Sequence, residues 1–358
     1  MTIYNNFNYD HKTEAKIGIL LVNLGTPEAP TPSALRNYLN EFLADPRITE
    51  LPRWLWWLIL HGIILRTRPK HSAKKYQNIW TESGSPLLEI SKIQLQELRQ
   101  AIQANFEIPT KIVLGMRYGN PSIATGLEEL RQANARYILI LPLYPQYSST
   151  SSGSVFDAVS KALKGWRWIP DIRFISHYHD HPTYIQTLVI QIKKYWTEHG
   201  TPDKLLFSFH GIPKRFFLNG DPYYCECQKT ARLVAEQLDI PSQVVFQSRF
   251  GREEWLKPYT DETLIALGKA GLKRVDVVCP GFATDCLETL EEIDKENRQN
   301  FLQAGGKEFH YIPALNDSSG HIQLLLELIT QHTQGWNPTT NTNQQFEIFT
   351  KHKKTSQI

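Results

Sequence analysis

Short apolar runs that end at a glycine or a proline recur along the whole chain of 358 residues. The runs are, in order, IGILLVNLGTP, KIVLGMRYG, YILILPLYP, IRFISHYH, KLLFSFHGIP, QVVFQSRFG, VDVVCPGF and EFHYIPAL. Periodic segments typical of helices, such as residues 90–106 and 227–238, lie between them. Buried strands that alternate with helices are typical of α/β proteins with parallel sheets. The pattern therefore predicts an α/β fold.

The two halves of the chain match each other in order. IGILLVNLGTP and KLLFSFHGIP both end in Gly-x-Pro, KIVLGMRYG and QVVFQSRFG both end in Arg-aromatic-Gly, and YILILPLYP and VDVVCPGF both break at a proline. A chain of 41.3 kDa is also longer than one core usually serves. We therefore expect two similar domains, at residues 14–185 and 186–335, and a polar tail at residues 336–358.

The first half carries an extra apolar segment within residues 46–80. Residues 54–65 read WLWWLILHGIIL, a run shorter than the roughly 20 residues that span a bilayer. The segment is either a helix buried in the first domain or an exposed lip that holds a large flat ligand or lies on a membrane. As a lip, it would make its contacts through Trp56 and Leu60. Its basic border suits carboxylates or anionic lipids and consists of Arg66, Arg68, Lys70, Lys74 and Lys75.

The charges and cysteines exclude some functions. The net charge is +3 and the basic residues are spread along the chain, so nucleic acid is not expected as a partner. The polar N-terminal residues lack the apolar core of a secretory signal, and four cysteines are too few for a disulfide scaffold. These features predict a cytoplasmic protein.

Residues that follow the strands are candidates for chemistry, because ligands of open α/β sheets bind beyond the carboxyl ends of the strands. His210 follows one apolar run, and a later run leads into PGFATDCLETLEEID, which begins a helix. Asp285, Glu288 and Glu292 are spaced i, i+3, i+7 there and would share one helical face. Acids in a first helical turn also offset the helix dipole, and alone the stripe would be a solvated face.

His210 and Glu288 together indicate chemistry more strongly than either does alone. Both should open onto the same sheet edge, where a neutral imidazole facing a carboxylate suits proton transfer near pH 7. The same pair could bind a divalent first-row metal. Nucleotide binding has little support, because LGTPEAP is neither a Walker A sequence nor a GxGxxG fingerprint.

The remaining candidate ligands point less clearly to a site. The cysteines lack the spacing of a zinc finger or an iron-sulphur site, so we expect free thiols at Cys225, Cys227, Cys279 and Cys286. Three histidines alternate in HYHDH, and we interpret them as a surface cluster rather than a metal site; they are His177, His179 and His181.

The sequence closely resembles the ferrochelatases, which insert ferrous iron into a porphyrin in the last step of haem synthesis. The resemblance runs over residues 16–329, and its most specific parts are LLFSFHGIP around His210 and PGFATDCLETLEEI around Glu288. Further segments similar to the family are LVNLGTPEAP, GSPL, MRYGNPSI, LPLYPQYS, GDPYY and EWLKPYT.

The resemblance implies two similar Rossmann-like domains, each a parallel sheet flanked by helices, with a porphyrin cleft between them and a lip at residues 52–65. It implies that His210 and Glu288 are catalytic and are the candidate Fe2+ ligands, with Asp285 and Glu292 as the rest of an acidic path. Porphyrin-cleft residues are implied at Arg117, Tyr118, Tyr76, Trp255 and Ser208.

Several points stay open at the level of the sequence. His210 either binds the iron or accepts protons, and the oligomeric state is undetermined. Protoporphyrin IX is the expected substrate; the alternatives are coproporphyrin III, another tetrapyrrole metal chelatase, or a haem carrier without activity. No cofactor is expected beyond the substrate Fe2+, and no iron-sulphur cluster, because no cysteine follows Cys286. Peripheral association with the inner face of the membrane is possible through the lip.

Overall fold

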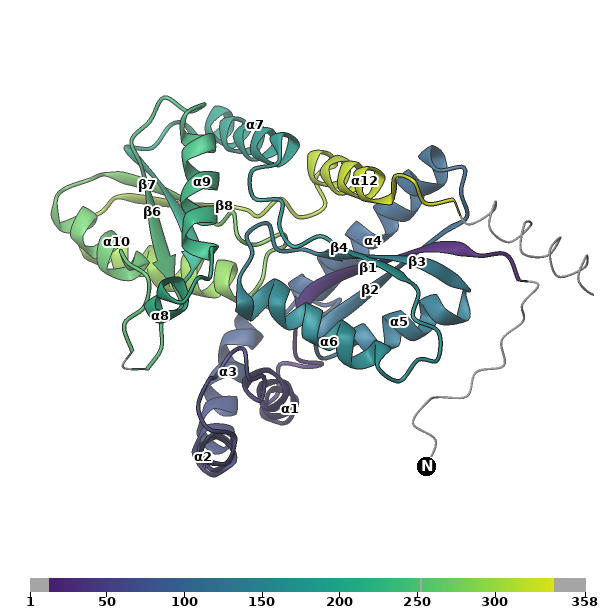
Figure 1. The fold of residues 1–358 in the computed structure, drawn as a ribbon. Helices are drawn as coiled ribbons and strands as arrows, with labels where there is room; N and C mark the ends of the chain where they lie inside the picture. The colour runs from purple at the N-terminus through teal and green to yellow at the C-terminus, as the bar shows by residue number, and fades with distance from the viewer. Residues whose placement is uncertain (1–12, 252, 338–358) are drawn as a thin grey trace, which may run out of the picture.

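Two parallel four-stranded sheets form the framework of the protein (Figure 1), and the computed structural model describes residues 13–251 and 253–337. The N-terminal sheet has the order β2-β1-β3-β4 and contains β1 (Lys16–Gly25), β2 (Thr110–Tyr118), β3 (Ala135–Pro142) and β4 (Asp171–Phe174). The C-terminal sheet has the order β6-β5-β7-β8 and contains β5 (Lys204–His210), β6 (Ser242–Gln247), β7 (Arg274–Val278) and β8 (Glu308–Ile312). The α/β fold class and the internal match between the halves are confirmed, because corresponding strands occupy corresponding places.

The strands read as continuous apolar runs because helices cover both faces of each sheet. Ile19, Leu20 and Leu21 in the middle of β1 are all fully buried, although successive side chains point to opposite faces. Leu20 pairs in parallel register with Val113 of β2 and Ile140 of β3. A central strand buried on both faces thus places its carboxyl end, and the residues that follow it, at the edge where ligands bind.

The helices form layers on the two sheets. The N-terminal half contains α4 (Pro86–Asn105), α5 (Ile123–Gln132), the short π-helix η2 (Ser149–Gly153) and α6 (Ser154–Leu163). The C-terminal half contains α7 (Pro182–His199), α8 (Lys214–Leu218), α9 (Tyr223–Ala235), α10 (Thr260–Lys269), the π-helix η3 (Glu288–Asn297), α11 (Arg298–Gln303) and α12 (Ser319–Thr333). Apolar side chains of α5 and α6 pack on one face of the N-terminal sheet, and those of α4 pack on the other.

The C-terminal helix α12 crosses back to the N-terminal half, where Figure 1 shows it beside α4. The residues after it are tied down there: the Trp336 indole donates a hydrogen bond to Asp171 at 2.9 Å, and the guanidinium of Arg173 lies 4.3 Å from the centre of its ring. Trp336 is therefore buried, although the sequence assigns it to a polar tail. The rest of that tail, residues 338–358, lies outside the described residues, and the domain boundary near residue 185 stays a prediction.

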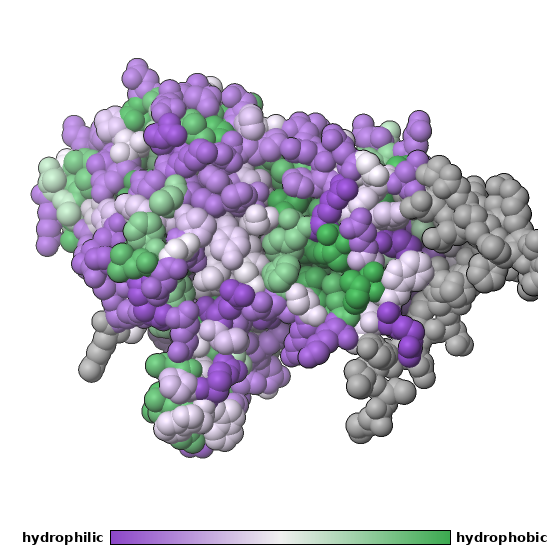
Figure 2. Space-filling view, viewed as in Figure 1, coloured by the Kyte–Doolittle hydropathy of each residue, from purple (hydrophilic) through white to green (hydrophobic). Residues whose placement is uncertain are grey.

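Residues 46–80 form a helical projection that we call the lip. With α1 (Pro32–Leu43) beside it, the lip contains α2 (Arg53–Ile59), the π-helix η1 (Leu60–Ile64) and α3 (Leu65–Ile79). Figure 2 shows the apolar surface of this projection, standing clear of the sheets. The interpretation of a helix buried in the first domain is therefore wrong.

The exposed side chains of the lip are not the two that the sequence indicates. Leu60 is 2% exposed and belongs to the core of the lip, and the Trp56 indole donates a hydrogen bond to the Leu43 carbonyl at 2.6 Å. The exposed apolar side chains are instead those of Trp54, Trp57, Leu58 and Ile63. None of the described helices has both the length and the apolar character that crossing a bilayer requires.

Candidate active site

A cavity of about 540 Å³ lies where the carboxyl ends of both sheets meet the lip. Leu24 and Tyr144, near the ends of β1 and β3, line it from the N-terminal half. His210 and Glu288 line it from the C-terminal half, and α3 of the lip adds Arg68. The structure thus brings His210 and Glu288, which are 78 positions apart in the chain, to one cavity.

His210 is the last residue of β5, and its backbone surroundings hold the imidazole in one tautomer. Nδ1 of His210 lies 2.6 Å from the carbonyl oxygen of Gly211 and donates to it, which leaves the lone pair on Nε2. Gly211 is required next to it because a Cβ there would lie 2.8 Å from the Gln247 carbonyl oxygen and 3.1 Å from the Trp255 ring. His210 can therefore accept a proton or bind a metal only through Nε2.

The acidic wall of the cavity is formed by the π-helix η3. Four glutamates of this helix line the cavity, namely Glu288, Glu291, Glu292 and Glu296. A π-helix has i to i+5 hydrogen bonds and a wider turn than an α-helix, and such helices are frequent at functional sites. All four carboxylates thus come to the cavity from this one helix.

Glu292 is held by the residues that end β6. Its carboxylate accepts hydrogen bonds from the Ser248 N–H at 2.7 Å and from the Ser248 hydroxyl, and Nε2 of Gln247 lies 3.4 Å away. Ser248 has a φ of 66°, a left-handed conformation that costs a non-glycine residue energy. Burial raises the pKa of Glu292 above the usual range, although the bonds from Ser248 and the charge of His210 oppose this effect. Glu292 is thus suited to exchange protons closer to neutral pH than an exposed glutamate.

Ser208, which the sequence assigns to the cleft, does not line the cavity but contacts Gln247, which in turn contacts η3. Its hydroxyl is fully buried and donates to Oε1 of Gln247 at 2.8 Å. Nε2 of Gln247 in turn donates to the backbone carbonyl of Glu288 at 2.9 Å. Ser208 is therefore a positioning residue that orients Gln247 against η3.

Asp285 also lies apart from the residues that line the cavity. Its carboxylate accepts four hydrogen bonds, from the Tyr311 hydroxyl at 2.6 Å, Asn316 Nδ2 at 2.7 Å, Thr289 Oγ1 at 3.0 Å and the Ala314 N–H at 3.3 Å. These bonds fasten the start of η3 to the segment after β8. Asp285 is thus occupied by structural contacts, and the structure does not bring it together with Glu288 and Glu292 at the cavity surface.

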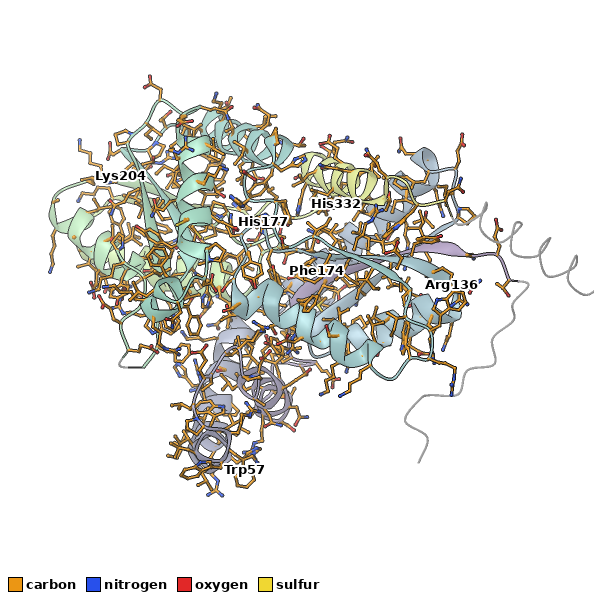
Figure 3. The ribbon with its side chains drawn as sticks, viewed as in Figure 1. Trp57, Arg136, Phe174, His177, Lys204 and His332 are labelled. Carbon is orange, nitrogen blue, oxygen red and sulfur yellow. The ribbon has the colours of Figure 1, made fainter. Side chains whose placement is uncertain are left out.

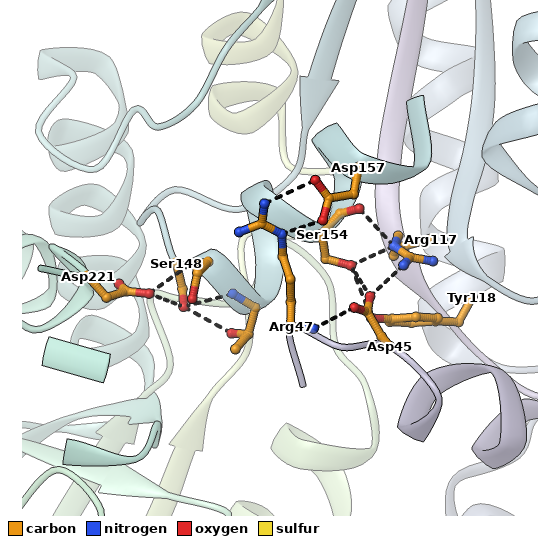
Figure 4. Close-up of polar contacts among 10 residues, drawn as sticks. Asp45, Arg47, Arg117, Tyr118, Ser148, Ser154, Asp157 and Asp221 are labelled. Atoms are coloured by element: carbon orange, nitrogen blue, oxygen red, sulfur yellow. Dashed lines mark hydrogen bonds and ion pairs between the residues drawn. The ribbon is translucent and has the colours of Figure 1, made fainter. Parts of the chain in front are cut away.

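Arg117 and Tyr118 belong to a polar cluster around Asp45 (Figure 4). Asp45 Oδ2 accepts hydrogen bonds from Arg117 Nη2 and Ser154 Oγ, both at 2.5 Å, and from the Tyr118 hydroxyl at 2.8 Å. Burial alone would raise the pKa of Asp45, but the bond from Ser154, the other donors and the Arg117 charge hold it below its usual range. Arg117 and Asp45 neutralise each other's charge, so Arg117 is not left free for an anionic substrate. Tyr118 contacts the cavity residue Phe42 edge to face at 5.0 Å, and the cluster therefore supports the cavity wall.

Tyr76 and Trp255 also act through neighbours. Tyr76 is buried in the core of the lip, where burial and the nearby negative charge of Glu288 raise its pKa. Trp255 is buried, and its ring lies 4.8 Å from that of Phe250, which lines the cavity. Neither aromatic residue lines the cavity, and both support it through neighbouring residues.

Basic side chains line the mouth of the cavity on the lip side and opposite it. Lys75 is paired with Glu296 at 2.5 Å, and Arg249 is paired with Asp261 at 2.8 Å. The Arg68 guanidinium lies 5.5 Å from the centre of the Phe250 ring and has no carboxylate partner among the described residues. Burial lowers the pKa of Arg68, so an anionic group placed here would stabilise its charge.

Sequence reasoning missed four residues that organise the site: Asp45, Ser154, Gln247 and Ser248. Gln247 and Ser248 end the apolar run QVVFQSRFG, and attention to the strand end itself would have found them. Asp45 and Ser154 follow no strand and have no periodic signal. The two residues are 109 positions apart in the sequence and come into contact only in the folded protein.

Burial keeps the thiols of three cysteines in their neutral form. Cys227, Cys279 and Cys286 are free and buried, and burial raises the pKa of each thiol. A thiol held in its neutral form is a poor nucleophile and a poor metal ligand. Cys286 lines the cavity but adds apolar surface there rather than an iron ligand.

Comparison with known proteins gives one consistent result. The ferrochelatase family profile matches residues 16–333. A ferrochelatase from Nitrosococcus oceani is 58% identical over 332 residues, which cover 92% of this chain and 90% of that protein. One from Marinobacter nauticus is 53% identical over 348 residues and covers 96% and 94%. The solved structure of SirB from Bacillus subtilis with Fe3+ shares the fold, with a TM-score of 0.54 at 13% identity, covering 89% of this chain and 96% of SirB. The chain therefore belongs to the ferrochelatase family, the lyases of haem biosynthesis that insert iron into a porphyrin.

Proposed function

We propose that the protein inserts Fe2+ into protoporphyrin IX, with release of two protons, as the last step of haem synthesis. One observation carries the proposal: Nε2 of His210 and the acidic wall of η3 line one cavity whose other walls are largely apolar. The cavity offers a flat apolar macrocycle surfaces to pack on and offers its centre a base and carboxylates. Fe2+ is itself a substrate, and we propose that no further cofactor takes part.

The reaction explains why these residue types are required. A free-base porphyrin has two pyrrole N–H protons that must leave as the iron enters, and a flat ring gives the metal no approach to its nitrogens. Apolar contacts can supply the roughly 1 to 5 kcal/mol of strain that bends the ring. The Nδ1 bond to Gly211 turns the lone pair of the neutral His210 ring to Nε2, which is placed to accept a pyrrole proton.

The carboxylates supply the path for protons and for the incoming cation. Glu288 lines the same cavity as His210, and Glu292 and Glu296 follow along η3. The raised pKa of Glu292 suits it to take a proton from a protonated imidazole and pass it outward. We propose that Asp285 contributes by anchoring η3, and that the path itself runs through Glu288, Glu292 and Glu296.

The distribution of cations supports a porphyrin with two propionates. Arg68 is available for a carboxylate, whereas Lys75 and Arg249 already have acidic partners. Four propionates, as in coproporphyrin III, would need more free cations at the mouth. We therefore propose that Arg68 binds a propionate of protoporphyrin IX.

The lip supports peripheral binding to a membrane surface. Trp54 and Trp57 are 70% and 59% exposed, and Arg66 and Lys70 lie close by in the chain. Amphipathic aromatic rings with neighbouring cations are typical of segments that bind the headgroup region. We propose that the lip rests on the inner face of the membrane, where an apolar porphyrin would be delivered.

The proposed reaction is tested by mixing the purified protein anaerobically with Fe2+ and with each of the two porphyrins. We expect the absorbance of protoporphyrin IX to change to that of its iron complex with multiple turnovers, and coproporphyrin III to react more slowly. The Arg68→Met variant should raise KM for protoporphyrin IX about tenfold, and Arg53→Met, on the same lip but outside the cavity, serves as the control. Preference for coproporphyrin III would contradict the substrate, and binding without metallation would indicate a carrier.

A further inference from the structure

A second group of potential metal ligands lies outside the cavity, between the two halves of the chain. It consists of His177 and His179, in the segment before α7, and Glu226 on α9. One ligand atom from each residue lies within 4.8 Å of the others. Figure 3 labels His177 at the junction between the two lobes, below α7.

The ligand atoms of these three residues lie close enough together to surround one ion. His177 Nδ1 lies 2.6 Å from one carboxylate oxygen of Glu226, and His179 Nδ1 lies 3.3 Å from the other. Ligand atoms 2.0–2.1 Å from a tetrahedral Zn2+ are about 3.3 Å apart. His179 and Glu226 already have this spacing, and His177, whose side chain is half exposed, can move outward to reach it.

His179 provides the independent indication of a ligand. It is 6% exposed, and its Nδ1 makes no hydrogen bond within the described residues, although it faces Glu226. A buried polar atom without a partner costs free energy that a bound cation would remove.

The surroundings of the cluster are also suited to a cation. Asp180 lies 4.0 Å from Nε2 of His179, beyond hydrogen-bond distance, and adds a second negative charge near the ligands. Lys229 is paired with Asp180 at 2.6 Å. Negative charge near the three ligands is therefore not cancelled by a free lysine.

We propose that His177, His179 and Glu226 bind one divalent first-row transition metal, with solvent as the fourth ligand. Two imidazoles and a carboxylate bind Zn2+ more tightly than Fe2+ in the usual affinity order of these ions. On binding, the metal replaces the proton between His177 and Glu226, and that proton leaves to solvent. The interpretation of HYHDH as a surface cluster does not hold for His179, because that residue is buried.

Such an ion would connect the second site to the porphyrin cavity. Glu226 Oε2 also accepts the N–H of Tyr147 at 2.6 Å, and the neighbouring Gln146 and Ser148 line the cavity. A metal on Glu226 thus ties together the segment before α7, the helix α9 and the loop behind the cavity. The bound ion is structural, and no step of iron insertion passes through it.

The proposal is tested by calorimetric titration with Zn2+ alone, in a His210→Ala/Glu288→Gln background that removes ligands of the porphyrin cavity. We expect one Zn2+ per chain in this background, and a rise in Tm on binding. Adding His177→Ala or Glu226→Gln should weaken the Zn2+ affinity on the order of 100-fold. Loss of a residue that only hydrogen-bonds a ligand already costs about 10- to 100-fold, and these two residues would be ligands themselves. His199→Ala, which removes an exposed imidazole at the end of α7, is the matched control and should not change it.

Two readouts keep the test independent of folding and of iron insertion. The Tm of each variant is first measured without metal, because His177→Ala also removes the 2.6 Å hydrogen bond to Glu226, and only the further rise on adding Zn2+ is compared. Co2+ should give visible d–d bands in the background protein that disappear with His177→Ala. No Zn2+ binding in the background, or binding unchanged by His177→Ala and Glu226→Gln, would overturn the proposal. The three residues would then be a hydrogen-bonded group only, whatever the activity of the wild-type protein.

Discussion

At the scale of single residues, the site depends on how two strand ends present polar atoms to one helix. β5 ends at His210 and β6 ends at Gln247. Gln247 and the next residue, Ser248, contact η3. The strained conformation of Ser248 aims both of its donors at Glu292. A left-handed conformation costs folding free energy, and such conformations are concentrated at functional sites. This supports a functional role for the Glu292 carboxylate that Ser248 holds.

Ser248→Ala should change the pH dependence of the reaction. The hydroxyl donates to the ionised carboxylate of Glu292 and lowers its pKa, so its removal should raise that pKa further. Because a protonated Glu292 cannot accept a proton, activity should fall at a higher pH on the acidic side, while the rate on the alkaline side changes little. The measurement is kcat against pH, with Ser160→Ala on the exposed face of α6 as control. An unmoved acidic limb would exclude Glu292 from the proton path.

The sequence predicts the central pair of residues but not their supporting contacts. His210 and Glu288 were identifiable because each follows a buried apolar run, and parallel strands bring such positions to one edge. The assignment of Asp285 to the same stripe assumed that the helix already includes Asp285, whereas the helix begins after it, and Glu288–Asn297 is a π-helix rather than an α-helix. Hydrogen bonds from i to i+5 cannot be inferred from residue types, so the stripe that lines the cavity is displaced toward Glu296.

At the scale of elements, the lip combines a buried core with an exposed tip. Leu60, Leu65 and Tyr76 pack together inside it, whereas α2 has no buried residue. A helix of seven residues without a buried face would not be stable alone in water. Its exposed apolar side chains suit the proposed contact of the lip with a membrane surface. The sequence could locate this segment but could not distinguish its inner from its outer residues.

Trp54→Ser/Trp57→Ser should weaken binding of the protein to anionic phospholipid vesicles at least about tenfold, which corresponds to about 1.4 kcal/mol. The two exposed indoles would otherwise bury apolar area in the headgroup region. Tm should be unchanged, because exposed side chains contribute little to folding. The measurement is co-sedimentation with vesicles.

Ile190→Ser on α7 is the matched control, because Ile190 is 58% exposed and α7 lies at the opposite end of the molecule from the lip in Figure 1. Equal vesicle binding by the tryptophan variant and the wild type would show that the lip does not contact the membrane.

At the scale of the whole molecule, two copies of one topology enclose a single cavity. The strand orders β2-β1-β3-β4 and β6-β5-β7-β8 correspond, and this repeat was predictable from three matching strand ends in the same order. The return of α12 to the N-terminal half was not predictable, because its apolar face fits either sheet and only the fold determines which one it covers. The cavity depends on this assembly, since Asn23 of the first half also contacts Thr284 of the second at 3.3 Å.

The central claim is that His210 and Glu288 carry out iron insertion in a cavity whose other walls bind the porphyrin. The most direct measurement compares wild type, His210→Ala and Glu288→Gln for anaerobic Fe2+ insertion into protoporphyrin IX, with porphyrin affinity measured separately by fluorescence quenching. We predict that each variant binds the porphyrin with an affinity close to that of the wild type but loses at least about 100-fold in kcat, the lower end of what a general base contributes. Turnover at the wild-type rate in both variants would contradict the claim.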